Sequence, residues 1–308
     1  MRGAVSKAVL KHYNVYPQSI IELGGGYYGK AYLVSLDKPP YMFVVKMYRF
    51  PNIAAAEAEQ IKLLTEYSLI KMPKIYYVLE RSQSGLEYDA LFMEYIKGVN
   101  AGVLDISEIP EGSRDAIADK IADNLIAVHS TKNPSGFGPV GAETYFASWH
   151  DYYFNIAKKV VIKAKALTKK GQLTEEILSV FKRSIECFGS IFDIPITEAS
   201  LIHGDYTTRN ILLNDRRTDV AAVIHPLNCC WADSEFDLYQ LDSGSGRELG
   251  LLERYSEKKE LSPNFESKRR FYELYTEVDH YFNLGDKVNL TAVGRLAERL
   301  LEILPKDA

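Results

Sequence analysis

The sequence predicts an α+β chain of two lobes. The first is a small N-terminal lobe with an antiparallel sheet and one main helix, and the second is a larger, mostly helical C-terminal lobe. Before residue 98, short apolar runs of strand length alternate with turn residues. After residue 102, apolar residues recur at helical spacing over long segments. We therefore divide the chain into residues 1–98 and 99–308, since 308 residues suffice for two lobes with cores of their own.

Composition excludes several classes of protein. With 46% hydrophobic and 25% charged residues the chain is not disordered, and a net charge of -4 argues against a protein that coats nucleic acid. Three cysteines without metal-type spacing indicate a reducing compartment. No apolar run reaches the roughly 18 residues of a membrane span, and the amino terminus lacks a signal-peptide core. We expect a soluble, cytoplasmic protein.

A glycine cluster joins the first two predicted strands. Residues 20–34 consist of two β-type runs, and the turn between them carries Gly24, Gly25, Gly26 and Gly29. Glycine lets a backbone approach phosphate groups without a side-chain clash. Such hairpins are also common as purely structural turns, so the function of this one depends on the segments that follow.

The next strand carries a lysine that needs a partner. Residues 41–48 read as a buried strand with Lys46 near its end, and a lysine there requires an ionic partner or an edge position. The Ala-rich helix predicted for residues 54–67 places Glu57 on its apolar face and turns Glu59 away. We predict that Glu57 pairs with Lys46. Glu59 is the alternative partner, and an exposed helix glutamate without a role is the simpler interpretation.

Two more strands and three long helices follow. The runs 74–79 and 88–97, separated by a turn, complete the small sheet before Gly98. Helical periodicity then covers residues 113–129, 148–166 and 172–188. We expect the aromatic residues that open the second of these helices to pack in the core rather than to form a ligand cage; they are Trp149, Tyr152, Tyr153 and Phe154.

The most informative stretch is residues 201–213, in which His203-Gly204-Asp205 follows an apolar run and Asn210 opens another. This spacing matches the catalytic loop of phosphoryl-transfer kinases. There the carboxylate takes the proton of the acceptor hydroxyl, and the amide oxygen is a hard ligand for Mg²⁺. A loop of turn-forming residues without a catalytic role is the alternative for this stretch considered alone.

The motifs together resemble one superfamily. After the strand-like run 220–224 come His225-Pro226 and then Glu235-Phe236-Asp237-Leu238. The chain resembles the aminoglycoside phosphotransferase and fructosamine (ketosamine) kinase superfamily, which has a protein-kinase-like fold. The matching positions are Gly24 to Gly29, Lys46, Glu57, the hinge Met93-Glu94-Tyr95-Ile96, His203 to Asn210, and Glu235 to Leu238. Residues 270–275 with His280 look most like the fructosamine kinase branch.

The resemblance implies an ATP-dependent kinase that transfers the γ-phosphate to a hydroxyl of an aminoglycoside-like or ketosamine-like substrate. It implies Asp205 as the base, Asn210 as a metal ligand, and Lys46, held by Glu57, as the phosphate contact. The glycine hairpin is then a lid, and the backbone of Glu94 and Ile96 binds adenine. The expected cofactors are ATP and Mg²⁺, and the expected partner is a small hydroxylated amine or sugar, with no nucleic acid and no membrane.

One position departs from the family. His225 stands where the family has an Asp that is the main Mg²⁺ ligand, so the candidate metal residues here are Asn210 and His225. Imidazole is a poor ligand for Mg²⁺ and suits Mn²⁺ or Zn²⁺ better. Three hypotheses follow. The protein is an active kinase that holds the metal with Asn210 and a further residue, a carboxylate such as Asp233, or a pseudokinase that binds nucleotide or a small ligand without transferring phosphate. The third hypothesis is a purely structural or partner-binding domain. The third leaves Lys46, Asp205 and Asn210 unexplained.

The acceptor site is less defined. A cationic substrate requires an acidic cleft, and carboxylates in the C-terminal half are candidates for it. The simpler interpretation of each is a solvated or helix-capping carboxylate. These candidates are Asp233, Glu235, Asp242 and Asp279. Trp231 offers a ring that can stack on a sugar, and core packing is an equal alternative.

Overall fold

The computed structural model describes residues 1–26, 28–226, 228–285 and 287–305, which group into two compact units. The first unit comprises the described residues within 1–128, 205–228 and 244–249, and the second comprises those within 129–204, 229–243 and 250–305. The first unit therefore contains the predicted N-terminal lobe together with the stretch that follows His203-Gly204. The lobe boundary predicted at residue 98 lies inside this unit and stays a prediction.

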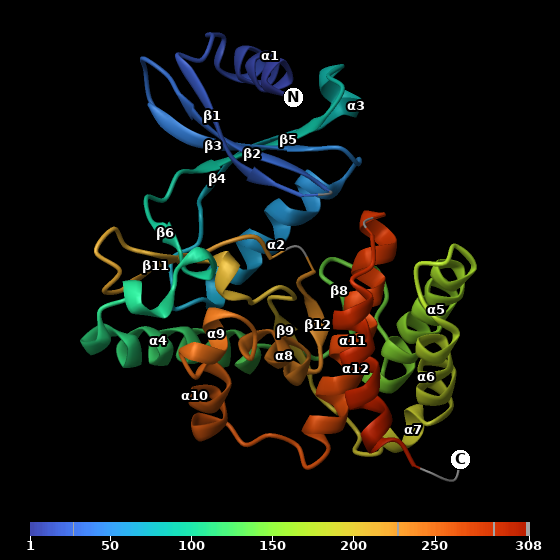
Figure 1. The fold of residues 1–308 in the computed structure, drawn as a ribbon. Helices are drawn as coiled ribbons and strands as arrows, with labels where there is room; N and C mark the ends of the chain where they lie inside the picture. The colour runs from blue at the N-terminus through green and yellow to red at the C-terminus, as the bar shows by residue number, and fades with distance from the viewer. Residues whose placement is uncertain (27, 227, 286, 306–308) are drawn as a thin grey trace. The chain divides into compact units, whose positions relative to one another are not determined.

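The first unit is built on a five-stranded antiparallel sheet with the strand order β1-β2-β3-β5-β4. Its strands are β1 Ser19–Gly25, β2 Gly29–Ser35, β3 Met42–Tyr48, β4 Ile75–Leu79 and β5 Asp89–Glu94. Alternation along β3 buries Val45 and Met47 on one face. Helix α1 (Arg2–Tyr13) lies beside the sheet (Figure 1) and contributes Val5 and Val9 to the same core. Lys46 consequently points to the opposite face. The small antiparallel sheet is confirmed, and α1 is a second helix on it besides the predicted one.

The predicted helix over residues 54–67 is α2, Ile53–Tyr67, and it buries one stripe that includes Glu57. A second, three-stranded sheet in the same unit joins segments far apart in the sequence: β6 (Val99–Asn100), β10 (Ile211–Leu213) and β11 (Val220–Val223), in the order β11-β10-β6. The remaining helices that lie wholly or mostly in this unit are α3 Arg81–Ser84, η1 Ala101–Val103, η2 Ile106–Glu108, α4 Glu111–Ser130, η3 Thr208–Asn210 and α9 Ser245–Glu248.

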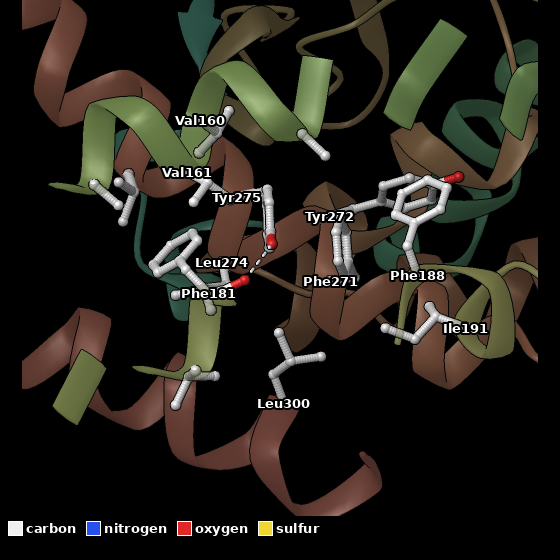
Figure 2. Packing of buried hydrophobic residues seen from close by; sticks show 14 of the residues in the cluster. Val160, Val161, Phe181, Phe188, Ile191, Phe271, Tyr272, Leu274, Tyr275 and Leu300 are labelled. Carbon is white, nitrogen blue, oxygen red and sulfur yellow. Dashed lines mark hydrogen bonds between the residues drawn. The ribbon is translucent and has the colours of Figure 1, made fainter. Parts of the chain in front are cut away.

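The second unit is mainly helical, and its core is aromatic. Helix α11 (Phe265–Leu284) lies against α5 (Trp149–Lys169) and α12 (Leu290–Ile303), and α6 (Glu175–Glu186) lies against α5 and α12. Figure 2 shows Phe181, Phe271 and Tyr275 in this core, with the Tyr275 hydroxyl donating to the Phe181 carbonyl. Four short strands form a sheet in the order β7-β9-β12-β8: β7 Lys132–Asn133, β8 Gly138–Pro139, β9 Ala199–Ile202 and β12 Cys230–Ala232. The short helices are α7 Phe188–Ile191, η4 Ser234–Asp237, α8 Leu238–Leu241 and α10 Leu251–Lys258.

The predicted helices over 113–129 and 148–166 are confirmed as α4 and α5, and Trp149 and Tyr153 are buried in the core as expected. The third prediction, residues 172–188, is wrong at both ends. The Thr174 side chain accepts a hydrogen bond from the Ile177 backbone N–H, so α6 begins after this cap. The helix ends at Glu186, and α7 starts separately at Phe188.

The three cysteines are free thiols in the second unit, and burial raises the pKa of Cys229, which keeps this thiol protonated. In the described ranges, no helix has the length and apolar character that a membrane crossing requires.

Candidate active site

An ion pair between β3 and α2 lies at the centre of the site. Lys46 Nζ is 2.9 Å from Glu57 Oε1 and 2.8 Å from Oε2, which confirms Glu57 rather than Glu59 as the partner of Lys46. The buried Tyr48 hydroxyl donates to Glu57 Oε2 at 2.6 Å. Burial alone would raise the pKa of Glu57, but the Lys46 ammonium beside it holds the pKa well below its usual range. Glu57 is therefore ionised near neutral pH.

His225 joins this pair from the segment that follows β11. Its Nδ1 lies 2.6 Å from Lys46 Nζ and 3.2 Å from Glu57 Oε1, and about a third of the side chain is exposed (31%). The backbone of His225 has φ 60°, in the left-handed region that non-glycine residues rarely adopt. Strained conformations of this kind are common at functional sites, and this one directs the imidazole onto Lys46. Sequence patterns contain no signal for this contact.

The predicted catalytic loop is tied to the His225 segment by its own polar groups. The Asn210 side chain, nearly buried, donates from Nδ2 to the Asp205 carbonyl at 2.7 Å. The Asn210 carbonyl accepts from the Ile224 backbone N–H at 2.9 Å. Asp205 is half-buried, and both residues belong to the first unit with Lys46 and Glu57. The structure thus brings the sequence-predicted residues Lys46, Glu57, Asp205, Asn210 and His225 into one unit.

The turn His203-Gly204, which precedes the predicted catalytic loop, lies in the second unit. It is held by Asp237, a residue whose role the sequence did not reveal. The fully buried Asp237 accepts hydrogen bonds from the backbone N–H groups of His203 and Gly204, each at 2.8 Å. It also faces His129 Nε2 at 3.3 Å, while His129 Nδ1 is 2.8 Å from the Tyr255 hydroxyl. Asp237 belongs to the Glu235 to Leu238 run that matches the superfamily, so the sequence marked this residue as one of interest. No local pattern shows that it binds the backbone of His203, 34 residues away.

The glycine cluster forms the predicted hairpin, in which Gly25 pairs with Lys30 between β1 and β2. A Cβ at Gly29 would lie 1.9 Å from the Met47 carbonyl oxygen, so β3 requires a glycine here. Gly24 has φ 153° next to a bulge and also favours glycine. A Cβ at Gly26 meets nothing within 4 Å, which leaves this tip position open for a ligand or a side chain.

The predicted hinge, residues 93–96, begins in the last two residues of β5. The Glu94 side chain pairs with Lys71, and the Glu94 backbone N–H donates to the Lys74 carbonyl at 2.8 Å. Ile96 is half-buried and lies beyond the end of the strand, and its backbone N–H makes no hydrogen bond to any residue that the structure describes. A free N–H at this point is compatible with adenine binding by the backbone.

The acidic candidates for the acceptor site all take part in ion pairs of the second unit: Asp233 and Glu235 with Lys268, Asp242 with Arg269, and Asp279 with Lys163. Asp233 also caps η4 by accepting from the Glu235 backbone N–H at 3.0 Å, in line with the simpler interpretation. Trp231 is partly buried against the helical core. These contacts favour structural roles and leave the acceptor residues unassigned.

The donor set does not fit Mg²⁺. Asn210 offers one amide oxygen, and Nδ1 of His225 is already in contact with Lys46. Over the described ranges, no three His, Cys, Asp or Glu side chains converge in a way that could hold a metal ion. Mg²⁺ binds hard oxygens, usually with at least one carboxylate, and the family resemblance implies that carboxylate at the position of His225.

Comparisons with known proteins agree with the motifs. The uncharacterized protein YcbJ of Escherichia coli is 25% identical over 248 residues, 80% of each chain. A protein of Vibrio parahaemolyticus named as a probable ketoamine kinase is 22% identical over 84% of this chain and 85% of its own. The crystal structure of an aminoglycoside phosphotransferase with ADP and hygromycin B superimposes with a TM-score of 0.71 at 16% identity, covering 99% of both chains. This similarity confirms the kinase-like fold.

The model of the fructosamine kinase family matches residues 2–302, nearly the whole chain. This match confirms the expected family and with it the expected class of enzyme, a phosphotransferase that acts on hydroxyl groups of small molecules. The chain belongs to the fructosamine kinase family.

Proposed function

We propose that this protein is a kinase that transfers the γ-phosphate of ATP to a hydroxyl of a small ketoamine-like or aminoglycoside-like substrate. One observation carries the proposal: a continuous path of contacts in the first unit. It runs from Asp205 through Asn210 to the Ile224 backbone, and from the adjacent His225 to the Lys46–Glu57 pair. Such a path fixes a candidate base relative to the His225–Lys46 contact, where positive charge can lie beside the nucleotide phosphates, as phosphoryl transfer requires.

Asp205 is proposed as the group that accepts the proton of the acceptor hydroxyl. Its backbone carbonyl is held by the Asn210 amide, and the two preceding backbone N–H groups, of His203 and Gly204, are held by Asp237. Each of these contacts lies within one unit, and the Asn210 contact holds the backbone of the candidate base inside the first unit before substrate binds.

Nucleotide binding is proposed at the sheet of the first unit. The hairpin that contains Gly24, Gly25 and Gly26 supplies backbone for the phosphates, and Glu94 and Ile96 supply backbone groups for adenine. The structure with ADP that shares this fold supports the assignment of a nucleotide, and ATP is the specific proposal.

The acceptor class is proposed from the relatives. The Vibrio parahaemolyticus relative is named as a ketoamine kinase, and the aminoglycoside phosphotransferase structure contains hygromycin B. The words ketoamine and aminoglycoside both denote molecules that carry amino groups. We therefore propose a sugar–amine adduct as the first substrate to examine, with aminoglycosides as the second.

The proposal is tested by incubating the protein with ATP and a series of ketoamines and aminoglycosides, with Mg²⁺, with Mn²⁺ and with a chelator. Phosphate-ester product and ADP are both measured. The substitution Asp205→Asn should lower the rate of transfer by about 10²- to 10⁴-fold, the usual contribution of a general base. Asp215→Asn, at an exposed carboxylate paired with Lys97, is the matched control and should leave the rate unchanged. Equal rates for wild type and Asp205→Asn would contradict the role of Asp205.

A second candidate function, a pseudokinase, is favoured by the contact between His225 and Lys46, because a family metal ligand is missing at this position. This candidate requires nucleotide binding without any phosphate transfer. Formation of a phosphate ester with any acceptor in the series excludes it, and binding of ATP without product for every acceptor supports it.

A further inference from the structure

The contact with Lys46 determines which nitrogen of His225 carries the proton. Lys46 is an ammonium paired with Glu57, so it has three N–H donors and no lone pair. Among the described residues, its three close acceptors are Glu57 Oε1 at 2.9 Å, Glu57 Oε2 at 2.8 Å and His225 Nδ1 at 2.6 Å. Nδ1 must accept at this distance, because a proton on it would face the ammonium. The proton of a neutral His225 is therefore on Nε2.

The neighbouring contact between His225 and Glu57 also follows from an unprotonated Nδ1. An unprotonated Nδ1 cannot donate, so the 3.2 Å between Nδ1 and Glu57 Oε1 is not a hydrogen bond. The two atoms lie close together because both accept from the Lys46 ammonium. All three N–H groups of Lys46 then have partners within the protein. In this arrangement Lys46 has no donor left for a nucleotide phosphate.

Nε2 of His225 is the donor that remains. It forms no hydrogen bond with any described residue. The buried side-chain atoms that lack a hydrogen bond do not include it, so it is not buried. With 31% of the side chain exposed, Nε2–H is therefore open to solvent and to a ligand. A nitrogen that carries a proton has no lone pair for a metal ion, whereas it can donate to a phosphate oxygen.

We propose that His225 donates from Nε2–H to a phosphate oxygen of the bound nucleotide, with the Lys46 ammonium behind it, and that the nucleotide therefore binds without a divalent metal ion. This inference rests on the proposed function, since it concerns the nucleotide of that site. A carboxylate at position 225 would repel phosphate unless a cation lay between them. The neutral imidazole does not repel phosphate, and Lys46 polarises it towards donation.

The tautomer is tested first, in the absence of nucleotide, by long-range proton–nitrogen NMR of the full chain labelled with ¹⁵N-histidine. The His225 signals are assigned by their loss in His225→Gln. We expect Nδ1 of His225 to be unprotonated and Nε2 to carry the proton. A protonated Nδ1, as the neutral alternative or in imidazolium, would overturn the inference and would leave the proposed function intact.

Binding of ATP is then measured by calorimetry with Mg²⁺ and with a chelator. Wild type should bind with affinities that agree within about threefold in the two buffers. His225→Asp should bind about tenfold or more weakly in chelator and recover with Mg²⁺, since one charge-assisted hydrogen bond corresponds to about this factor. Asp tolerates positive φ, so the backbone accepts this variant. His280→Asp, the same substitution at an exposed position of α11, is the matched control and should behave as wild type.

His225→Gln separates donation from packing, because its side-chain amide can place an N–H near the position of Nε2. We expect it to keep metal-independent binding within about threefold of wild type. Wild-type binding that weakens tenfold or more in chelator, or equal behaviour of His225→Asp and wild type, would overturn the inference alone. Absence of ATP binding in both buffers would overturn it together with the proposed function.

Discussion

Replacement of Lys268 by Met tests how the second unit holds the segment that ends in Asp237. Lys268 is 2% exposed, and its ammonium lies 2.7 Å from both Asp233 and Glu235. Burial alone would lower the pKa of Lys268, but the two carboxylates raise it above its ordinary value. The lysine is therefore charged, and Lys268→Met leaves two buried carboxylates without their cation.

The expected loss follows from the contacts that remain. Removal of one partner from a buried ion pair costs about 3–5 kcal/mol. Asp233 keeps the Tyr272 hydroxyl at 2.8 Å and a backbone N–H, and Glu235 keeps the backbone N–H and hydroxyl of Ser262, both at 2.6 Å. Because each carboxylate retains two donors, we expect the lower end of this range, about 3 kcal/mol.

Urea denaturation followed by tryptophan fluorescence measures this loss selectively. Both tryptophans, Trp149 and Trp231, belong to the second unit, so their emission reports on that unit alone. Lys163→Met, which removes a partly exposed pair with Asp279 in the same unit, is the matched control and should lose at most about 1 kcal/mol. A loss below about 1 kcal/mol for Lys268→Met would mean that Lys268 does not stabilise the two carboxylates, because removal of the cation from a buried ion pair costs more than this.

Two further predictions concern packing and pH. Gly29→Ala should lower the free energy of unfolding of the first unit, measured by calorimetry, by about 1–3 kcal/mol, because its Cβ would meet the Met47 carbonyl. Gly26→Ala should have no such effect. Equal stability of the two variants would contradict the hairpin packing. Burial lowers the pKa of His129 below 6.5, although Asp237 opposes this shift. As the pH drops below about 6.5, the unfolded chain therefore takes up a proton at His129 before the folded chain does, and the free energy of unfolding falls. His129→Gln should melt at temperatures that differ less between about pH 7.5 and pH 5.5, and an unchanged difference would refute this assignment.

Much of the fold could be predicted because the signals are local. A run of β-type residues with one lysine, followed by an amphipathic helix, was enough to pair Lys46 with Glu57, since the helical period places that glutamate on the apolar stripe. The order of the motifs was enough to predict the kinase-like fold. Helix ends were less accessible, because α6 begins where the Thr174 side chain caps it rather than where its apolar pattern starts.

The parts that could not be predicted depend on contacts between distant segments. Asp237 binds the backbone of His203 and Gly204, and backbone partners leave no trace in the residue types of the partner segment. Asp233 and Glu235 read as acceptor candidates because Lys268, their common partner, lies more than 30 residues further on. The Nδ1 contact of His225 with Lys46 depends on a left-handed backbone conformation, which the sequence does not indicate.

Hydrogen–deuterium exchange of the full chain with and without ATP shows whether the first unit holds a nucleotide site. We expect ATP to slow the exchange of backbone amides in the hairpin around Gly26, at the hinge around Ile96 and in the loop 205–210. Asp215, in the turn after β10, should be unaffected because it is exposed and paired with Lys97. Protection confined to other segments, or no protection at saturating ATP, would rule out a nucleotide site in the first unit.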